Sequence, residues 1–442
     1  MKRRSYPEYK DSGVEWLRVV PEHWKIQRIR NIVDMSVSNV DKHTKEGELS
    51  VRLCNYIDVY KNDKITERIS FMRATATPEE IERFRLEPDD VLITKDSESW
   101  NDIGIPALVE YTADDLVCGY HLASLRPRKT LIRGPFLLRA LQCPEVAFQF
   151  HVAANGVTRY GLSHESIKSV LLPVSPLTEQ ANIAAFLDCE TAKLDALIAK
   201  KERLIELLRE KRAALISHAV TKGLDPSAPM KDSKIEWLGD IPVHWNVLKF
   251  SREIHIAKGQ IDPEVEPYLS MLLIAPNHIE SGTGRLLLEQ TASEQSAQSG
   301  KYQCSAGDII YSKIRPALAK ITIAPRNCLC SADMYPMSGS SRIVNPYLLW
   351  LFLSKQFTAW SILEADRVAM PKINRETLNE LRMPVPSLSE QRAIADYLDH
   401  EEEKVNKIIV KVRLAIEHLL EYRTALISAA VTGKIDVRRE VA

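Results

Sequence analysis

The sequence has few of the features that mark secreted, membrane-spanning or metal-binding proteins. No apolar run approaches the roughly 18 residues that span a bilayer, and the basic stretch at residues 1–7 lacks the apolar segment of a signal peptide. Seven cysteines, an odd number scattered along 442 residues, predict reduced thiols in a cytoplasmic protein with no membrane segment. Cys328 and Cys330 have no second pair nearby, so we expect no zinc site.

The chain also lacks the motifs of a free-standing enzyme. No glycine-rich loop ends in Gly-Lys-Ser or Gly-Lys-Thr, the pattern that cradles nucleotide phosphates. Asn345-Pro346-Tyr347 contains part of an amino-methyltransferase motif, but its second proline is missing and no glycine-rich cofactor turn precedes it. We therefore expect no catalytic residue, no metal and no cofactor in this chain. His23 and His244, each followed by a tryptophan, are assigned a structural role.

The formal net charge is zero, but the charges are unevenly distributed. Residues 116–144 contain no acid, and residues 309–363 contain only Asp333. The cations of these two stretches are Arg126, Arg128, Lys129, Arg133 and Arg139, then Lys313, Arg315, Lys320, Arg326, Arg342 and Lys355. Because phosphate binding depends on local potential, a neutral total can hide two basic faces. For any one of these residues, an ordinary solvated surface charge remains the alternative.

The chain is built as two related halves. Residues 172–225 recur as residues 383–436, and residues 11–24 recur as residues 232–245. Paired anchors of the longer repeat are Pro173 with Pro384, Glu179-Gln180 with Glu390-Gln391, Leu187-Asp188 with Leu398-Asp399, and Arg212 with Arg423. Such a duplication suggests a pseudo-two-fold molecule, and duplex DNA is the commonest partner with its own two-fold relation.

Each copy of the longer repeat has the pattern of a long helix. Apolar residues fall seven apart, with a companion row expected three positions later. The main rows are Leu187, Leu194, Lys201, Leu208 and Leu215 in the first copy and Leu398, Val405, Val412, Leu419 and Leu426 in the second. Thr178 and Ser389 are the expected caps, and Gly223 and Gly433 the expected stops. A helix of about 40 residues is roughly 60 Å long.

A lone helix with one narrow apolar seam is marginal, so we expect the two helices to pair as one coiled coil. A pseudo-two-fold axis perpendicular to the helices gives antiparallel packing, although the direction depends on the blocks between them. Lys201 interrupts the seam. It either fixes the register as a polar seam residue or extends its charged end from the seam edge.

The remaining chain forms two blocks that we expect to be mixed α/β domains. Strands are predicted over 50–60, 90–95 and 308–313, and helices over 135–150 and 346–363. Lys95 and Lys313 match at the exits of aligned strands. The predicted fold class is thus two globular α/β domains separated by two long helices in an antiparallel coiled coil with pseudo-two-fold symmetry. The predicted boundaries are 1–171, 172–226, 227–382 and 383–442.

Several duplicated motifs resemble the specificity subunit of type I restriction–modification systems. They are Glu-Trp-Leu-Gly-Asp-Ile-Pro-x-His-Trp at 236–245, the helix entry Pro-x-x-Leu-x-Glu-Gln-x-x-Ile-Ala-x-x-Leu-Asp, and the helix end Arg-x-Ala-Leu-Ile-Ser-x-Ala-Val-Thr-x-Gly. The resemblance covers essentially the whole chain. It implies that each globular block is a target recognition domain for one half of a bipartite, asymmetric DNA site, and that the helices set the spacing between the halves.

The resemblance also implies the partners. Two methyltransferase (M) subunits dock on the helices, restriction (R) subunits join the full complex, and double-stranded DNA is the ligand. The partners use S-adenosylmethionine to methylate adenine, ATP to translocate and Mg²⁺ to cut, whereas the specificity chain is not catalytic. The seam positions Leu187, Leu194, Leu208, Leu215, Leu398, Val405, Val412, Leu419 and Leu426 are assigned to helix pairing and subunit docking.

We expect DNA contacts from polar residues near the aligned strands and the basic stretches, with Lys95 and Lys313 first among them. The full set is Lys95, Ser97, Arg126, Arg128 and Arg159 in the first block and Lys313, Arg315, Lys320, Arg367 and Lys372 in the second. Two other classes of function remain open. One is a methyltransferase or nuclease that acts alone, and the other is a scaffold that joins proteins without binding DNA.

Overall fold

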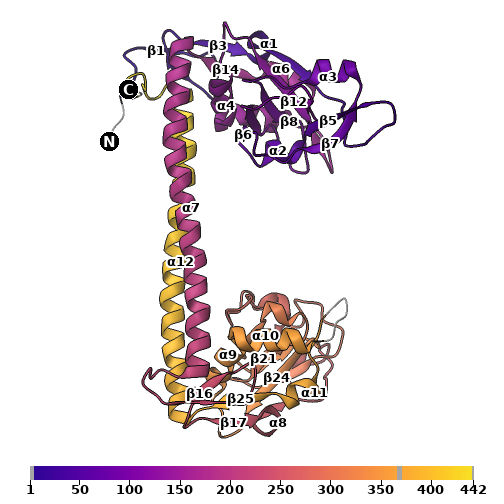
Figure 1. Cartoon of the computed structure of the whole chain (residues 1–442), viewed down its shortest axis with the longest axis vertical. Coiled ribbons are helices and arrows are strands. Elements are labelled where there is room, and N and C mark those ends of the chain that lie inside the picture. Colours follow the sequence, from indigo (N-terminus) through magenta and orange to yellow (C-terminus); the bar gives the residue numbers. More distant parts are fainter. Residues whose placement is uncertain (1–3, 366–370, 441–442) are drawn as a thin grey trace. The chain divides into compact units, whose positions relative to one another are not determined.

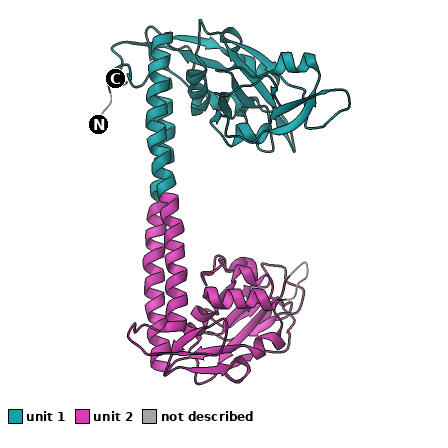
Figure 2. Cartoon of the chain, viewed as in Figure 1, with its two compact units in different colours: residues 1–200, 414–442 teal, residues 201–413 magenta. Residues whose placement is uncertain are grey.

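A computed structural model describes residues 4–365 and 371–440. The chain divides into two compact units, residues 1–200 with 414–442 and residues 201–413 (Figure 2). Each unit takes one end of each long helix, α7 (Leu177–Lys222) and α12 (Leu388–Val431). No helix in the described part of the chain is long and apolar enough to cross a membrane. The predicted domain boundaries remain predictions.

The first unit contains a block of two sheets with short helices (Figure 1). The larger sheet has the order β4-β12-β8-β10-β6 and the smaller has the order β11-β5-β7. The larger sheet consists of β4 (Val33–Val37), β12 (Leu122–Pro127), β8 (Val91–Thr94), β10 (Pro106–Val109) and β6 (Lys64–Ile65). The smaller consists of β11 (Leu116–Cys118), β5 (Leu49–Cys54) and β7 (Met72–Ala76). Both sheets are mixed, because β10·β6 and β11·β5 are parallel pairs.

Helices and short ribbons complete this block. The helices are α1 (Ile29–Ile32), α2 (Tyr56–Tyr60), α3 (Pro78–Phe84), α4 (Gly134–Gln142), α5 (Pro144–Ala153) and α6 (His164–Ser169). The ribbons are β1 (Tyr9–Asp11) with β2 (Val19–Pro21), β9 (Asp96–Ser97) with β13 (Tyr160–Gly161), and β3 (Lys25–Arg28) with β14 (Leu171–Val174). The β3·β14 pair ties the entry of the block to the strand that leads into α7.

The second unit repeats this plan with its own sheets. They have the orders β18-β24-β21-β22 and β19-β23-β20. Their strands are β18 (Ile254–Ile256), β24 (Met334–Gly339), β21 (Ile309–Ser312), β22 (Ile321–Ile323), β19 (Leu273–Ile274), β23 (Cys328–Cys330) and β20 (Tyr302–Cys304). The ribbon β17 (Asn246–Lys249) with β25 (Arg382–Val385) corresponds to β3·β14, and β15 (Met230–Asp232) with β16 (Asp240–Pro242) corresponds to β1·β2. The helices are α8 (Phe250–Glu253), α9 (Asn345–Leu353), α10 (Lys355–Glu364) and α11 (Arg375–Glu380), with 3-10 turns at Tyr268–Ser270, Pro276–His278 and Pro316–Leu318.

The helices run antiparallel within each unit. In the first unit, Leu187 near the start of α7 shares a core with Leu426 near the end of α12. In the second unit, Ile216 near the end of α7 shares a core with Leu398 near the start of α12. These cores continue into the blocks, where a fully buried tryptophan, Trp24 or Trp245, belongs to each. The predicted α/β blocks with an antiparallel coiled coil are confirmed.

The buried seam between the helices contains a different companion row from the one expected. The main row is buried or half-buried at every position, including Lys201. The expected companion row, three positions later, is wrong, because Leu197, Leu204, Ile408 and Tyr422 are 42%, 41%, 44% and 49% exposed. The buried companions follow four positions later, as at Ile205 and Ile409. Both offsets lie on one face of a helix, so packing against the partner helix decides between them.

Three local expectations are also corrected. The strand predicted over 50–60 ends at Cys54, because the side chain of Asn55 caps α2 by accepting a 3.0 Å hydrogen bond from the Ile57 amide. The helices predicted over 135–150 and 346–363 are each two helices, α4–α5 and α9–α10. Thr178 and Ser389 lie inside α7 and α12, and Ser387 caps α12 instead. The stops are confirmed, since Gly223 and Gly433 follow the helices with φ of 79° and 73°.

Candidate nucleic-acid interface

The first unit brings three of its predicted DNA-contacting residues together. Strand β8 ends at Thr94, and the amide of Leu162 donates a 2.9 Å hydrogen bond to the carbonyl oxygen of Lys95. In the following ribbon, Ser97 pairs with Tyr160. Arg159 directly precedes this pair, so Lys95, Ser97 and Arg159 lie on one small ribbon although Arg159 is far away in sequence.

The second unit builds the same connection. The amide of Ile373 donates a 2.9 Å hydrogen bond to the carbonyl oxygen of Lys313, and that of Arg315 donates a 2.7 Å bond to Pro371. Ile314 and Lys372 form a bridge between these two bonds. Lys313, Arg315 and Lys372 therefore lie together, at positions that match Lys95, Ser97 and Gly161 of the first unit. Arg367 lies outside the described residues.

The two matched lysines have similar surroundings. The ammonium of Lys95 lies 5.7 Å from the ring centre of Tyr120, and that of Lys313 lies 5.6 Å from the ring centre of Tyr335. Lys95 also reaches Asp96 at 3.0 Å, whereas Lys313 donates a 2.7 Å hydrogen bond to the carbonyl oxygen of Ala332. Each ammonium thus has a partner already, and any phosphate has to compete with it.

Charged side chains form a chain of contacts on the first ribbon. Asp96 accepts hydrogen bonds from Lys95 and, at 2.8 Å, from Nδ1 of His121. Burial acts to raise the pKa of Asp96, but the bonds from His121 and Lys95 outweigh it and hold this pKa below its usual value. Arg159 continues the chain, with Nη2 3.3 Å from both ring nitrogens of His121.

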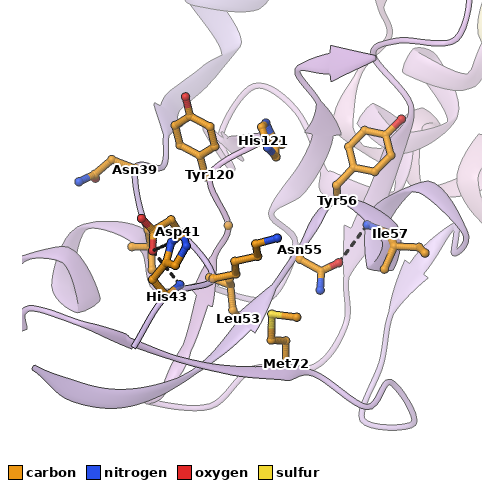
Figure 3. A pocket seen from close by; sticks show the side chains of 13 residues that line it. Asn39, Asp41, His43, Leu53, Asn55, Tyr56, Ile57, Met72, Tyr120 and His121 are labelled. Atoms are coloured by element: carbon orange, nitrogen blue, oxygen red, sulfur yellow. Dashed lines mark hydrogen bonds and ion pairs between the residues drawn. The ribbon is translucent and has the colours of Figure 1, made fainter. Parts of the chain in front are cut away.

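Two hollows lie beside this ribbon and share Tyr56 and His121. The first, of about 550 Å³, has Asn55 and Tyr56 on one side and Asp41 and His43 on the other (Figure 3). The second, of about 1020 Å³, is lined by Tyr56, Tyr60, Asp96, Ser97, Glu98, Ser99, Asp102, His121, Thr158 and Arg159. Aromatic rings, hydrogen-bonding groups and one arginine together form a surface suited to the faces and edges of bases.

Three other predicted contacts are tied into the fold elsewhere. Arg126 donates to Asp90 at 2.9 Å and to Glu87 at 2.7 Å, and Arg128 donates to Asp34 at 2.8 Å. The Lys320 ammonium donates to the carbonyl oxygen of Ile279. Arg126 and Arg128, in the acid-free stretch of sequence, are therefore neutralised by carboxylates from the loop before β8 and from β4. A DNA role for these three residues remains a prediction.

The repeated glutamine joins each block to its helix. Gln180 accepts a 3.0 Å hydrogen bond from the amide of Arg133 and donates to the carbonyl oxygens of Leu131 and Ser175. Gln391 makes the same three bonds, accepting at 2.8 Å from Val344 and donating to Arg342 and Pro386. Both glutamines are fully buried. The repetition of this residue therefore has a structural explanation.

The repeated histidines contact the neighbouring glutamates. Nε2 of His23 lies 2.8 Å from Glu179, and Nε2 of His244 lies 3.1 Å from Glu390. Tyr6 also donates to Glu179, while in the second unit Nε1 of Trp245 donates to Glu390 at 2.9 Å. These contacts hold the segment that precedes each block against the start of a long helix. They agree with the structural role assigned to the histidines.

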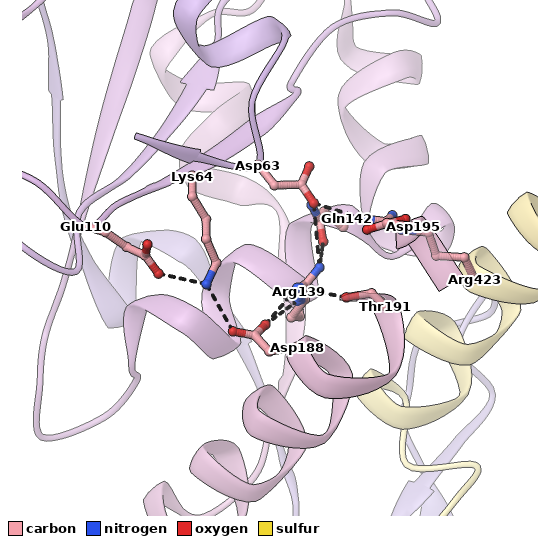
Figure 4. A network of polar contacts seen from close by, with 9 residues as sticks. All are labelled: Asp63, Lys64, Glu110, Arg139, Gln142, Asp188, Thr191, Asp195 and Arg423. Atoms are coloured by element: carbon pink, nitrogen blue, oxygen red, sulfur yellow. Dashed lines mark hydrogen bonds and ion pairs between the residues drawn. The ribbon is translucent and has the colours of Figure 1, made fainter. Parts of the chain in front are cut away.

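A polar network reinforces the joint in the first unit (Figure 4). The Arg139 guanidinium donates to Asp188 at 2.7 Å and to Thr191 at 3.2 Å on α7. Lys64 lies 3.2 Å from Asp188, and Arg423 on α12 lies 3.0 Å from Asp195. The block is thereby connected to α7, and α7 to α12.

Sequence reasoning missed several residues of this surface. Tyr56, His121 and Asp96 come from α2, the turn before β12 and the ribbon strand β9, which are far apart in sequence. Nothing in their local patterns distinguishes them from other polar or aromatic residues. Among residues 4–365 and 371–440, no group of three or more His, Cys, Asp or Glu side chains is arranged to hold a metal ion.

Comparisons with known proteins point in one direction. Residues 247–418 match the family described as "Type I restriction modification DNA specificity domain". The chain is 34% identical over 274 residues to the "Type I restriction enzyme EcoDI specificity subunit" of Escherichia coli, and this match spans 57% of the chain but only 60% of that relative. It is 23% identical, over 95% of both chains, to the "Putative type I restriction enzyme MjaX specificity subunit" of Methanocaldococcus jannaschii.

Solved structures share the fold. One, titled "Structural basis underlying complex assembly and conformational transition of the type I R-M system", matches with a TM-score of 0.71 and 16% identity over 93% of this chain and 98% of that one. The "Crystal structure of HsdS subunit from Thermoanaerobacter tengcongensis" matches with a TM-score of 0.53 and 16% identity, covering 94% of this chain and 98% of that one.

Proposed function

We propose that the chain, whose residues 247–418 match the type I restriction modification DNA specificity family, is the non-catalytic DNA-recognition subunit of a methyltransferase and endonuclease complex. Each block reads one half of a bipartite, asymmetric duplex site. The paired helices set the distance between the halves and hold two methyltransferase subunits. These partners, with restriction subunits in the full cytoplasmic complex, bring S-adenosylmethionine, ATP and Mg²⁺.

The observation that supports this proposal most directly is that the same ribbon occurs in both units. Its backbone connection is the same in both units, from Lys95 to Leu162 and from Lys313 to Ile373. Its side chains differ, since the first ribbon carries Asp96 where the second has Ile314. A common frame with different contact residues is what two readers of different half-sites require.

The chemistry of the ribbons supports both kinds of DNA contact. Lysine and arginine provide salt-dependent affinity for phosphates. Hydrogen bonds and apolar contacts to base edges discriminate sequences, with each good bidentate pair contributing about 1–3 kcal/mol. Among the candidates, Arg159, Arg315 and Lys372 fit these roles, because in the described structure their side-chain cations are held neither by a carboxylate nor by a backbone carbonyl oxygen.

The helices offer an exposed apolar row for the methyltransferase subunits. Leu197 in the first unit and Ile408 in the second occupy matching positions of the repeat and are 42% and 44% exposed. Leu204 and Tyr422 extend this row along α7 and α12. Since the matching positions occur once in each unit, the surface fits two copies of the same partner.

The decisive experiment combines the chain with its cognate methyltransferase subunits and maps methylation by long-read sequencing. We expect one asymmetric motif whose two halves flank a fixed spacer, and no methyl transfer by the chain alone. Transfer by the isolated chain establishes an enzyme that acts alone. Equal binding of the assembled complex to random and genomic duplexes establishes a scaffold without DNA specificity.

A further inference from the structure

A hairpin extends the ribbon of the first unit to an apolar tip. The amide of Asn155 donates a 3.1 Å hydrogen bond to the carbonyl oxygen of Gly161, and the amide of Gly161 donates a 2.9 Å bond back to Asn155. Gly161 also pairs with Asp96, so the hairpin adds a strand-like edge to β9 and β13. Val157 at the tip is 91% exposed.

The shape of this tip is fixed by its backbone. Gly156 has a φ of 153°, and a Cβ placed there lies 1.9 Å from the carbonyl oxygen of Arg159. Any other residue at this position therefore forces the turn to open. The structure thus holds Val157 outward on a constrained hairpin, although burial of its side chain favours stability.

The same apolar position recurs in the second half of the sequence. Ala154 and Val157 recur as Ala365 and Val368, and the following Leu162 recurs as Ile373. Val368 lies outside the described residues, so the recurrence is an observation on sequence alone. The position that matches Gly156 is Arg367, so the second half repeats the valine but not the glycine that constrains the first hairpin.

The hollow beside the hairpin is suited to base edges rather than to phosphates. Thr158 and Arg159 of the hairpin line it together with Asp96, Glu98 and Asp102. Three carboxylates repel the phosphates of DNA, whereas they can accept hydrogen bonds from the amino groups of bases. The major groove of B-DNA, about 12 Å wide, admits a two-stranded ribbon.

We propose that the hairpin 155–161 enters the major groove of one half-site and that Val157 packs against the 5-methyl group of a thymine. This inference rests on the proposed DNA recognition. Apolar contact with that methyl group distinguishes thymine from the other bases. A minor-groove wedge is the competing arrangement, but such wedges are typically larger or more rigid side chains, such as Phe, Leu, Ile, Met or Pro.

The test uses the complete complex of the chain with its methyltransferase subunits, on a duplex carrying the mapped site. Each thymine of the site is replaced in turn by deoxyuracil, which lacks only the methyl group. We expect one replacement to weaken binding by the unchanged complex about threefold to fourfold, the factor for one buried methyl group. Val157→Ala should weaken binding to the original duplex and abolish the effect of that one replacement.

Val19→Ala is the matched control, because Val19 is 48% exposed in the same unit but lies on β2, outside the ribbon. It should bind every duplex as the unchanged chain does. Thermal unfolding of both variants checks that the fold is retained; the tip valine lies outside the cores of the first unit.

Several results overturn the inference. The first is a mapped site that has no thymine in either half. The second is a Val157→Ala complex whose binding is weakened by every deoxyuracil replacement as much as that of the unchanged complex. The third is a Val157→Ala complex in which the effects of all replacements change by the same factor. Increased fluorescence of 2-aminopurine, placed within the site, on binding by the unchanged but not the Val157→Ala complex identifies a wedge and also overturns it. If the unchanged complex shows no sequence preference at all, the proposed function itself fails.

Discussion

Arg139 donates a hydrogen bond from Nη2 to Oδ1 of Asp188, 2.7 Å away, and so joins the first block to α7. The matching carboxylate of α12, Asp399, accepts a 2.9 Å hydrogen bond from Nε1 of Trp350. The same helix position thus holds each block through a different donor. The repeat preserves the acceptor on the helix, while the blocks have diverged in how they reach it.

Removal of Asp188 from its ion pair with Arg139 should cost more stability than removal of Arg139. The Arg139 side chain is 4% exposed, whereas that of Asp188 is 36% exposed and also contacts Lys64. Asp188→Ala leaves the buried cation with Asp63, 3.8 Å away, as its only carboxylate partner in the described structure, and should reduce the stability of the first unit by about 3 kcal/mol. Arg139→Met leaves a carboxylate that water and Lys64 still reach, and should cost about 1–2 kcal/mol.

Hydrogen exchange at the amides of residues 177–200 measures this difference. Asp399→Ala, the matched change in the second unit, should leave exchange of these amides unchanged. Equal losses for Asp188→Ala and Arg139→Met contradict the asymmetry.

The buried glutamines predict matched losses in the two units. Gln180→Ala and Gln391→Ala each leave one amide and two carbonyl groups without their partner. Each change should cost about 2–5 kcal/mol, since unsatisfied buried groups carry their desolvation penalty. Urea unfolding followed by hydrogen exchange in each unit measures the effect. Gln303→Ala, at an exposed position on β20, is the control. If it loses as much stability as Gln180→Ala and Gln391→Ala, burial of the glutamines is not the cause of their effect.

The helix pair predicts different outcomes for two positions three residues apart on α12. Val405 is 5% exposed in the seam and Ile408 is 44% exposed outside it. Val405→Asp buries a carboxylate and should destabilise the second unit by about 3 kcal/mol or more. Ile408→Asp should leave the unfolding free energy within about 0.5 kcal/mol but remove apolar surface that we assign to methyltransferase docking.

Sedimentation with saturating methyltransferase subunits distinguishes these outcomes. Ile408→Asp and its counterpart Leu197→Asp should each bind one subunit in place of two. The double variant should bind none. If all three variants still bind two subunits, the exposed row is not the docking surface.

These elements also show how far the sequence predicts the structure. The main heptad row is readable because every position from Leu398 to Leu426 repeats an apolar residue without Gly or Pro between them. The phase of the second row is not readable, since Ile408 and Ile409 are both apolar and only the partner helix selects Ile409 for burial.

The candidate interface shows the same limit. Lys95 and Lys313 were predictable as equivalents because each follows a buried strand with a clear pattern. The pairing of Arg126 with Asp90 was not predictable, because Asp90 directly precedes β8 and is brought beside Arg126 only by the register of β12 against β8. Charge runs in a sequence therefore predict surface potential poorly when strands are paired across long separations.

A buried histidine predicts a pH effect in the second unit. His278 is 2% exposed, and burial lowers its pKa below the usual value of about 6.5. Because the unfolded chain takes up the proton more readily, stability should fall as the pH drops below about 6.5. His278→Asn, whose oxygen can accept the 3.3 Å hydrogen bond from the Ala275 amide, should reduce this loss.

Urea midpoints of the second unit at pH 7.5 and pH 5.5 measure the difference. His255→Asn, at an exposed position of the same unit, should leave the pH dependence unchanged. An identical acid-induced loss in the His278→Asn chain excludes this histidine as the cause.

The division of both helices between the two units predicts how the spacing of half-sites can be changed. The first unit ends at Lys200 on α7 and resumes at Leu414 on α12. Insertion of one heptad after Lys200 and another after Arg413 keeps the seam in phase and adds about 10 Å at 1.5 Å per residue. With 3.4 Å per base pair, the preferred spacer should lengthen by about three base pairs.

A heptad inserted in α7 alone removes the match between the helices and should reduce both stability and DNA binding. Methylation mapping of the altered complexes measures the spacer, and an unchanged spacer after the matched insertions rules out the helices as its determinant.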